Sequence, residues 1–156
     1  MEFNVVGPRG ILQIDDARIV YRNFAGEGNK FNQKGNRNFS IVIPDEDIAE
    51  QLRADGWNVK SKPARDEDEI PFMHLPVKIK FNDRGPTAYL KSGNKLIELD
   101  EESISCLDDV DIAYAEVDIR PFDWDVNGKT GRTAYLHSIC ITQEIDRFAA
   151  KYGSDE

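Results

Sequence analysis

The sequence predicts a mainly-β protein, a small barrel with one or two short helices. Short apolar stretches with the alternation of strands outnumber those with helical spacing. The links between them are rich in Gly and Asn, which favours turns over crossover helices. A length of 156 residues and a hydrophobic share of 40% suit one core. We therefore expect a single domain over residues 1–148 and a short tail over 149–156.

The first elements expected are a long strand and its hairpin partner. The strand covers residues 10–21, and its apolar phase slips around Asp15 and Asp16, which predicts a bend or bulge. The second strand covers residues 38–43, with alternate apolar residues on one face. The Gly- and Asn-rich link over residues 25–36 is expected to form a long hairpin loop.

A short amphipathic helix is expected over residues 45–56. Asp45 is placed to cap its N-terminus, and Gly56 is placed to end it. The segments expected next are a strand at 57–62, a charged exposed loop at 63–71, a half-buried strand at 75–81, a turn at 82–86 and a strand at 87–93.

The C-terminal part is expected to contain a second short helix and a long hairpin. The helix covers residues 99–109, and the two strands cover 110–124 and 131–145. Asn127 and Gly128 between these strands are a strong turn signal. A helix between the early and later strands of a small barrel is typical of the OB-fold, so we predict an OB-fold-like barrel.

Charge is distributed unevenly along the chain. Residues 98–118 contain nine Asp and Glu residues and no Lys or Arg, which equals the net charge of −9. Residues 18–37 instead carry five Lys and Arg residues against Glu27 alone. An acidic protein with one locally basic face remains compatible with binding nucleic acid.

Several classes of function lack their sequence signals. The two cysteines and two histidines show no paired metal-ligand spacing, so no metal is expected. No phosphate-binding glycine loop or nucleophile elbow occurs, so we expect a non-enzyme without catalytic residues or a cofactor. An apolar run of 18 residues and a secretory signal are also missing, which favours a cytoplasmic protein without a membrane partner.

Two loops combine rings with basic side chains and with Gly and Asn. The first contains Tyr21, Arg22, Phe24, Lys30, Phe31, Lys34 and Arg37, and the second contains Arg120, Phe122, Trp124, Lys129 and Arg132. Unpaired bases stack on rings for about 1–3 kcal/mol each, and Lys and Arg neutralise phosphates. In OB-folds such loops flank one binding face. The alternative is that these rings simply pack under their loops or cover the edge of the core.

These segments together resemble a known family. The stretches "DARIVYRNFAG", "FNQKGNRNFSIVI", "ADGWNVK", "LPVKIKF", "VDIAYAEVDIRPFDW" and "GRTAYLHSICITQE" are similar, in order, to the OB-fold single-stranded DNA-binding proteins of phages over residues 10–148. The resemblance implies a protein that coats single-stranded DNA in replication or recombination, mostly independently of sequence, in the host cytoplasm. It implies replication or recombination proteins as partners and leaves self-association open. The candidate binding residues are Tyr21, Arg22, Phe24, Lys34, Arg37, Trp57, Trp124, Lys129 and Arg132.

The residues leave two other interpretations open. Residues 98–118 could form an acidic interaction module that mimics nucleic acid and inhibits a host DNA-binding protein. Such a protein would bind a basic partner and have no affinity for DNA. An enzyme or a structural component of the virion is the third interpretation, and the structural role would show as stable oligomers indifferent to nucleic acid.

Overall fold

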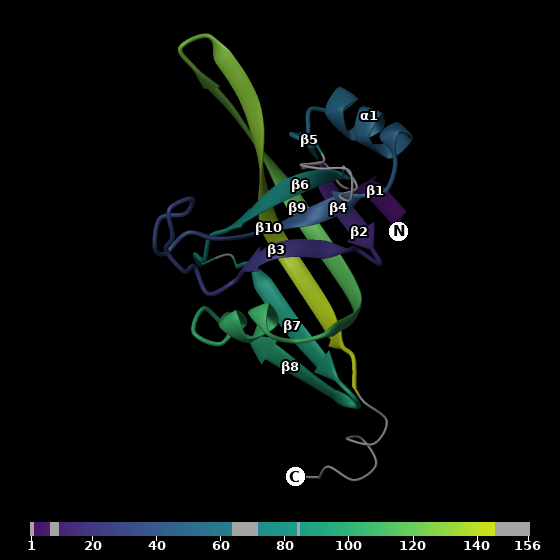
Figure 1. Ribbon diagram of the computed structural model, residues 1–156, viewed down its shortest axis with the longest axis vertical. Helices are drawn as coiled ribbons and strands as arrows, with labels where there is room; N and C mark the ends of the chain where they lie inside the picture. Colours follow the sequence, from purple (N-terminus) through teal and green to yellow (C-terminus); the bar gives the residue numbers. More distant parts are fainter. Residues whose placement is uncertain (1, 7–9, 64–71, 84, 146–156) are drawn as a thin grey trace.

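The computed structural model describes residues 2–6, 10–63, 72–83 and 85–145. These residues form one ten-stranded sheet, one α-helix and a 3₁₀ helix, η1, so the mainly-β architecture is confirmed (Figure 1). The elements are β1 (Glu2–Val6), β2 (Ile11–Asp15), β3 (Ile19–Asn23), β4 (Arg37–Ile43), α1 (Glu46–Ala54), β5 (Lys60–Lys62), β6 (Phe72–Ile79), β7 (Thr87–Ser92), β8 (Lys95–Leu99), η1 (Ile104–Asp108), β9 (Ile112–Val126) and β10 (Lys129–Gln143).

The sheet has the strand order β1-β2-β9-β10-β6-β4-β3. The strands β2 and β3 are the two halves of the long first strand that the alternation predicts. Taken as one strand, they pair with β4 on one side and with β9 on the other, and β10 pairs parallel with β6. With β2 and β3 counted as one strand, β4, β6, β10 and β9 complete the closed five-stranded arrangement of an OB-fold.

The predicted irregularity near Asp16 is the point where the barrel closes. Asp16 immediately follows β2 and has a φ of 55°. The Ala17 amide then donates to the Ala115 carbonyl of β9 at 2.9 Å, and the Arg18 carbonyl accepts from the Val42 amide of β4 at 2.9 Å. The chain therefore passes from one edge of the sheet to the other within two residues.

The helix α1 forms where the sequence predicts it. The Asp45 side chain accepts a hydrogen bond from the Ile48 amide at 2.9 Å, and Gly56 follows the helix with a φ of 107°. Glycine adopts this conformation without steric strain. Ala49 and Leu52 are buried, so the helix packs its apolar side against one end of the barrel (Figure 1).

The second predicted helix is shorter than expected. Only η1, Ile104–Asp108, is helical, because the Asp100 carboxylate accepts hydrogen bonds from the Glu102 and Ser103 amides and makes a turn. Ile104 and Leu107 are fully buried. This segment therefore contributes apolar side chains to the core.

Other boundaries also differ from the predictions. The strand expected at 57–62 reduces to β5 because Trp57 and Val59 turn into the core. The edge strands β1 and β8 were not predicted. They are strands because they pair with β2 and β7, and no local pattern indicates that pairing. Residues 64–71 of the loop expected at 63–71, the tail over 149–156 and the end of the predicted domain lie outside the described residues.

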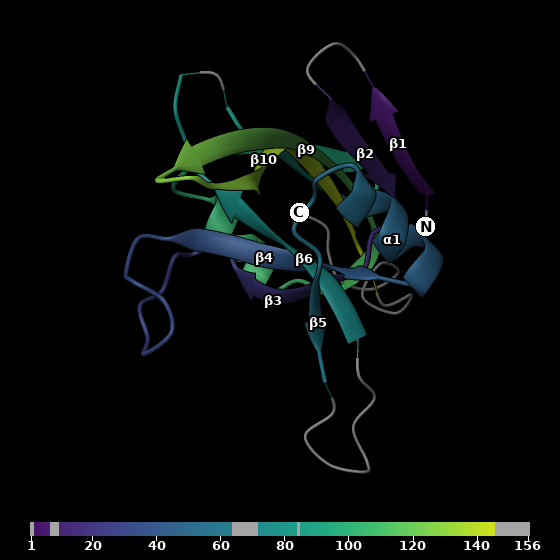
Figure 2. The same cartoon turned by 90° about the horizontal axis from the view of Figure 1, so that it is seen from above.

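The strands β9 and β10 form the longest hairpin of the molecule. Asn127 and Gly128 have φ values of 52° and 80°, the left-handed conformations that a tight two-residue hairpin turn requires. The hairpin extends beyond the barrel along the long axis of the molecule, and the loop between β3 and β4 projects sideways (Figure 1). Seen from above, both lie on the left of the barrel (Figure 2). The two loops that sequence analysis selected therefore flank one side of the barrel.

Candidate nucleic-acid interface

Two rings expected to stack on bases belong to the hydrophobic core. Phe24 has 0% of its surface exposed and stacks on Phe39, with ring centroids 5.1 Å apart. Trp57 is 2% exposed. Neither ring has a free face in this structure, so the assignment of Phe24 and Trp57 as base-stacking residues was wrong. Their aromatic character serves packing.

The three arginines among the candidates hold the protein's own backbone. Arg22 donates to the carbonyls of Leu107 and Val110, at 2.8 and 2.6 Å, which fixes η1 against β3. Arg37 donates to the Phe24 carbonyl at 2.9 Å. These hydrogen bonds to backbone carbonyls indicate that Arg22 and Arg37 position neighbouring segments of the chain.

Arg132 fastens the β9–β10 hairpin to the end of α1. Its guanidinium bonds the Asp123 carboxylate, at 2.6 and 3.2 Å, and the Asp55 carbonyl at 2.7 Å. It also lies 5.0 Å from the ring centre of Trp57. The hydrogen bond from Arg132 lowers the pKa of Asp123. A Cβ at Gly56 would approach the guanidinium carbon to 3.2 Å, so a glycine suits this junction.

Four of the predicted residues remain accessible. Lys34 and Lys129 are exposed on the two loops. Trp124 is 38% exposed, and its ring lies over Gly131, where any Cβ would overlap it. Tyr21 is 48% exposed. Phe31, which sequence analysis did not select as a binding residue, is 87% exposed in the same loop as Phe24.

Tyr21 belongs to a cluster of rings and cations that sequence analysis did not assemble. The Lys62 ammonium donates to the Tyr21 hydroxyl at 2.8 Å. The Tyr21 ring lies 6.0 Å from Phe72 and 5.6 Å from His74, measured between centroids. Lys60 is the cross-strand partner of His74. We call these five residues the Tyr21 cluster.

A second cluster lies further along the same outer surface. Tyr135 is the strand partner of Lys78 on β6 and of Arg120 on β9. The Arg120 guanidinium carbon lies 4.9 Å from the Tyr135 ring centre, and Phe122 meets the same ring edge-on with centroids 6.0 Å apart. Phe122 is 51% exposed. We call these residues, with Trp124 two positions further along β9, the Tyr135 cluster.

The two clusters and Lys80 form one aromatic–basic face. Phe72, His74, Lys78 and Lys80 alternate with the buried residues of β6 and its end, so they point outward together. His74 and Lys78 are four residues apart, about 13 Å along a strand. The described residues form two ion pairs, and both involve Arg132. The lysines of this face and Arg120 therefore have no carboxylate partner there.

The loop between β3 and β4 is held in shape by its own amides. The Asn32 side chain donates to the carbonyls of Glu27 and Asn36, each at 2.9 Å. The Gly35 amide donates to the Gly26 carbonyl at 2.8 Å. The Lys30 ammonium lies 5.2 Å from the ring centre of Phe31. Both side chains therefore project from an organised loop.

The carboxylates of β2 and β9 occupy a different surface. Asp15 and Glu116 are strand partners, as are Gln13 and Asp118. Burial raises the pKa of Asp118. This acidic surface lies on β2 and on β9 as far as Asp118. The cations of the aromatic–basic face lie on β5, on β6 and at Arg120 of β9. The two surfaces adjoin on β9, where Asp118 and Arg120 are two residues apart.

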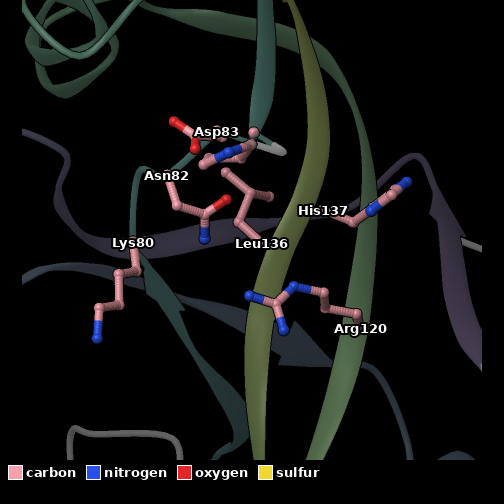
Figure 3. Close-up of a pocket in the computed structure, with 8 residues that line it drawn as sticks. Lys80, Asn82, Asp83, Arg120, Leu136 and His137 are labelled. Atoms are coloured by element: carbon pink, nitrogen blue, oxygen red, sulfur yellow. The ribbon is translucent and has the colours of Figure 1, made fainter.

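A hollow of about 480 Å³ adjoins the aromatic–basic face. Its lining includes Lys80, Arg120 and Leu136, together with Asn82 and Asp83 from the turn after β6 (Figure 3). Within the described residues, no cluster of His, Cys, Asp and Glu could hold a metal ion. None of the helices described is long and apolar enough to cross a membrane.

Solved structures of one phage protein share this fold. The single-stranded DNA-binding protein of bacteriophage Enc34 in complex with ssDNA matches with a TM-score of 0.57 and 12% identity, over 89% of each chain. A C-terminal truncation of the same protein matches with a TM-score of 0.56 and 12% identity, over 89% of this chain and 88% of that one. Another structure of the Enc34 protein matches with a TM-score of 0.54 and 11% identity, over 99% and 97%.

Sequence comparison identifies the family. A comparison with curated proteins found no match. A family model described as "Putative phage ssDNA-binding domain" matches residues 4–155, nearly the whole chain. The predicted resemblance is confirmed: this chain belongs to the phage ssDNA-binding domain family.

Proposed function

We propose that the protein coats single-stranded DNA through its aromatic–basic face, largely independently of base sequence, during phage replication or recombination in the host cytoplasm. One observation carries the assignment of the site: exposed rings and cations without carboxylate partners share one outer surface of the barrel. Two clusters, around Tyr21 and Tyr135, make up this surface. We also propose that the protein acts by binding and performs no catalysis.

The chemistry of the face fits an unpaired strand. Bases that are not paired expose their π-faces, and each can stack on a ring such as Phe122 or Tyr135. Lys78 and Arg120 lie beside these rings, where they can neutralise the phosphates between stacked bases. None of these contacts reads the hydrogen-bonding edge of a base, so we expect little sequence preference.

The two loops extend this surface at its sides. Phe31 and Lys34 project from the loop between β3 and β4, and Lys129 lies at the turn of the β9–β10 hairpin. The strands β4 and β6 between them correspond to the OB-fold strands whose face binds oligonucleotides. The Enc34 protein with the same fold is described in complex with ssDNA, which supports this choice of ligand.

Protein partners are expected to contact surfaces outside the aromatic–basic face. Replication or recombination proteins and further copies of this chain are the partners we propose. The acidic surface formed by Asp15, Glu116 and Asp118 is one such region. The DNA-mimic interpretation has less support, since Asp100 and Asp108 of the acidic segment bond the protein's own amides.

A titration with oligo-dT of about 30 nucleotides tests the function. We expect quenching of tryptophan fluorescence by the single strand, weakened by salt, and a much smaller effect of duplex DNA. Trp124 should be the reporter, because Trp57 is buried. A Trp124→Phe variant should lose the signal while fluorescence anisotropy of a labelled strand still reports binding.

The same titration can contradict the proposal in two ways. An absence of binding to any single strand at low salt would remove DNA coating as the function. Binding to a basic protein without affinity for DNA would favour the acidic interaction module. Unchanged affinity in a Phe122→Ala, Tyr135→Ala double variant would keep the function but move the site away from this face.

A further inference from the structure

The hollow beside the aromatic–basic face results from a change of partner along β10. Ala134 and Tyr135 pair in parallel with β6, whereas residues from Ser138 onward pair in parallel with β7. The register of β10 against β9 shifts between Leu136 and Ser138. The chain between β6 and β7 turns away here, and mutual backbone hydrogen bonds between Asn82 and Gly85, at 2.8 and 3.1 Å, close that turn.

The lining of this hollow combines cations, an amide and an apolar floor. Figure 3 shows the Arg120 guanidinium and the Asn82 amide directed toward a common space, with Lys80 at its side and Leu136 between them. The Asp83 carboxylate points away from this space. Lys80 and Arg120 have no ion-pair partner among the described residues. The favoured occupant therefore carries negative charge next to an apolar or polar ring.

Arg120 connects the hollow to the strand-binding surface. Its guanidinium lies 4.9 Å from the ring centre of Tyr135 and also lines the hollow. Lys80 continues the row of outward residues that begins with Phe72 on β6. A chain of nucleotides that crosses the Tyr135 cluster therefore reaches the hollow without leaving basic surface.

We propose that the hollow is a subsite for one nucleotide of the bound strand, turned out of the line of its neighbours; this rests on the proposed function. Its phosphate lies between Lys80 and Arg120, and its base enters against Leu136 and beside the Asn82 amide. A volume of about 480 Å³ lies within the range of small-molecule sites. A phosphate alone would leave most of that volume unfilled.

The test uses the shortest oligonucleotide that saturates one protein molecule, with one 2-aminopurine placed at each position in turn. This fluorescent base reports unstacking from its neighbours. In the wild-type protein we expect one position to respond much more strongly than the others. Asn82→Phe, which adds a ring inside the hollow, should abolish that response and weaken binding about tenfold, and urea unfolding checks that the variant remains folded.

Asn94→Phe is the matched control, because it makes the same substitution at an exposed position in the turn between β7 and β8, outside the lining of the hollow. It should retain both the response and the affinity. Equal responses at all positions, or an Asn82→Phe variant that behaves like wild type, would overturn the subsite while strand binding persists. Loss of strand binding by the wild-type protein would instead contradict the proposed function.

A second arm distinguishes the bound strand from free nucleotides, which offer the same chemistry. Free dAMP is titrated against the protein carrying the labelled oligonucleotide. We expect dAMP to compete weakly with the oligonucleotide and to reduce first the fluorescence of the strongly responding 2-aminopurine position. Saturation of the hollow by dAMP with no change in that response would overturn the assignment to the strand.

Discussion

Tyr21 combines an unfavourable backbone conformation with an exposed ring. Its φ is 54°, in the left-handed region that costs most residues about 1–2 kcal/mol. The β3–β4 register is irregular at this point, between Val20 and Asn23, and such bulges redirect side chains. The strain therefore accompanies the placement of the ring beside Phe72 and His74, which suits a functional position better than a packing one.

Replacement of Tyr21 by Asn separates binding from stability. Asn tolerates the left-handed conformation, so the free energy of unfolding should change by less than about 1 kcal/mol. Affinity for oligo-dT should fall about tenfold, as expected for one lost base stack. Urea unfolding and anisotropy titrations measure the two quantities.

Tyr114→Asn provides the control for this substitution. Tyr114 is 39% exposed on the acidic side of β9, so its loss should leave DNA affinity unchanged. Equal losses of affinity in the two variants would show that Tyr21 has no special role.

Arg132 illustrates how a residue type can suggest the wrong task. Sequence analysis selected it as a phosphate contact. In the structure it joins Asp123 on the hairpin to Asp55 after α1, and its side chain is only 19% exposed. We infer that it positions the hairpin that carries Trp124.

The salt dependence of binding distinguishes these tasks for Arg132. Loss of a phosphate contact lowers the slope of log K against log salt by about 0.7 for a single strand. Arg132→Ala should weaken binding with an unchanged slope, whereas Lys129→Ala should reduce the slope. Lys has no bidentate fork, so Arg132→Lys should not restore affinity. A reduced slope in Arg132→Ala that Lys repairs would show a direct phosphate contact.

At the scale of elements, η1 anchors the loop between β3 and β4. The Asp108 carboxylate accepts from the Phe24 amide at 2.7 Å and from the Ala25 amide at 3.0 Å. Arg22 ties the same helix to β3 from the other direction. The position of Phe31 and Lys34 on the proposed binding side thus depends on an acidic residue far away in the sequence.

Asp108→Ala should destabilise the protein and loosen this loop. Two partly buried amides lose their acceptor, which we expect to lower the free energy of unfolding by about 1–3 kcal/mol. Hydrogen exchange of residues 24–36 should accelerate more than that of β9. Asp109→Ala, at the neighbouring exposed carboxylate, is the control. If the two variants exchange alike, η1 does not anchor the loop.

At the scale of the whole molecule, the barrel gathers Lys60, Lys62, Lys78 and Lys80 on one outer surface. His74 lies on the cationic side, against Tyr21, Phe72 and the Ser40 hydroxyl, which is 3.0 Å from its Nδ1. Burial, together with the charges of Lys60 and Lys62, lowers the pKa of His74. Stability and DNA binding should therefore respond to pH in opposite directions.

The sign follows from proton linkage at His74. Its pKa is below 6.5 in the folded protein, so the unfolded chain binds more protons as pH falls below 6.5, and stability decreases there. Bound phosphates offset the charges of Lys60 and Lys62 and favour the imidazolium. Strand binding then takes up a proton, and affinity should rise over the same pH range.

Unfolding and anisotropy titrations at pH 5.5 and 7.5 measure this linkage. His74→Gln should remove both pH effects relative to wild type. An affinity whose pH dependence is the same in wild type and in His74→Gln would exclude His74 as the group responsible.

Local pattern was sufficient to predict most elements of this protein. Alternation located the barrel strands, Asp45 and Gly56 bounded α1, and Asn127 and Gly128 located the hairpin turn. These signals depend on neighbours in the chain, because capping, turn geometry and the two-residue period are local effects. The sequence by itself thus determined the fold class and the two loops that flank the proposed face.

Only the tertiary structure decided which side chains that face presents. Phe24 and Phe31 lie in the same loop and have the same chemistry, yet one is buried against Phe39 and the other is exposed. Tyr135 joins Lys78 through a pairing between strands far apart in the sequence. Exposure depends on long-range pairing, and a single bulge reverses which residues face outward, so no local pattern could have assembled this surface.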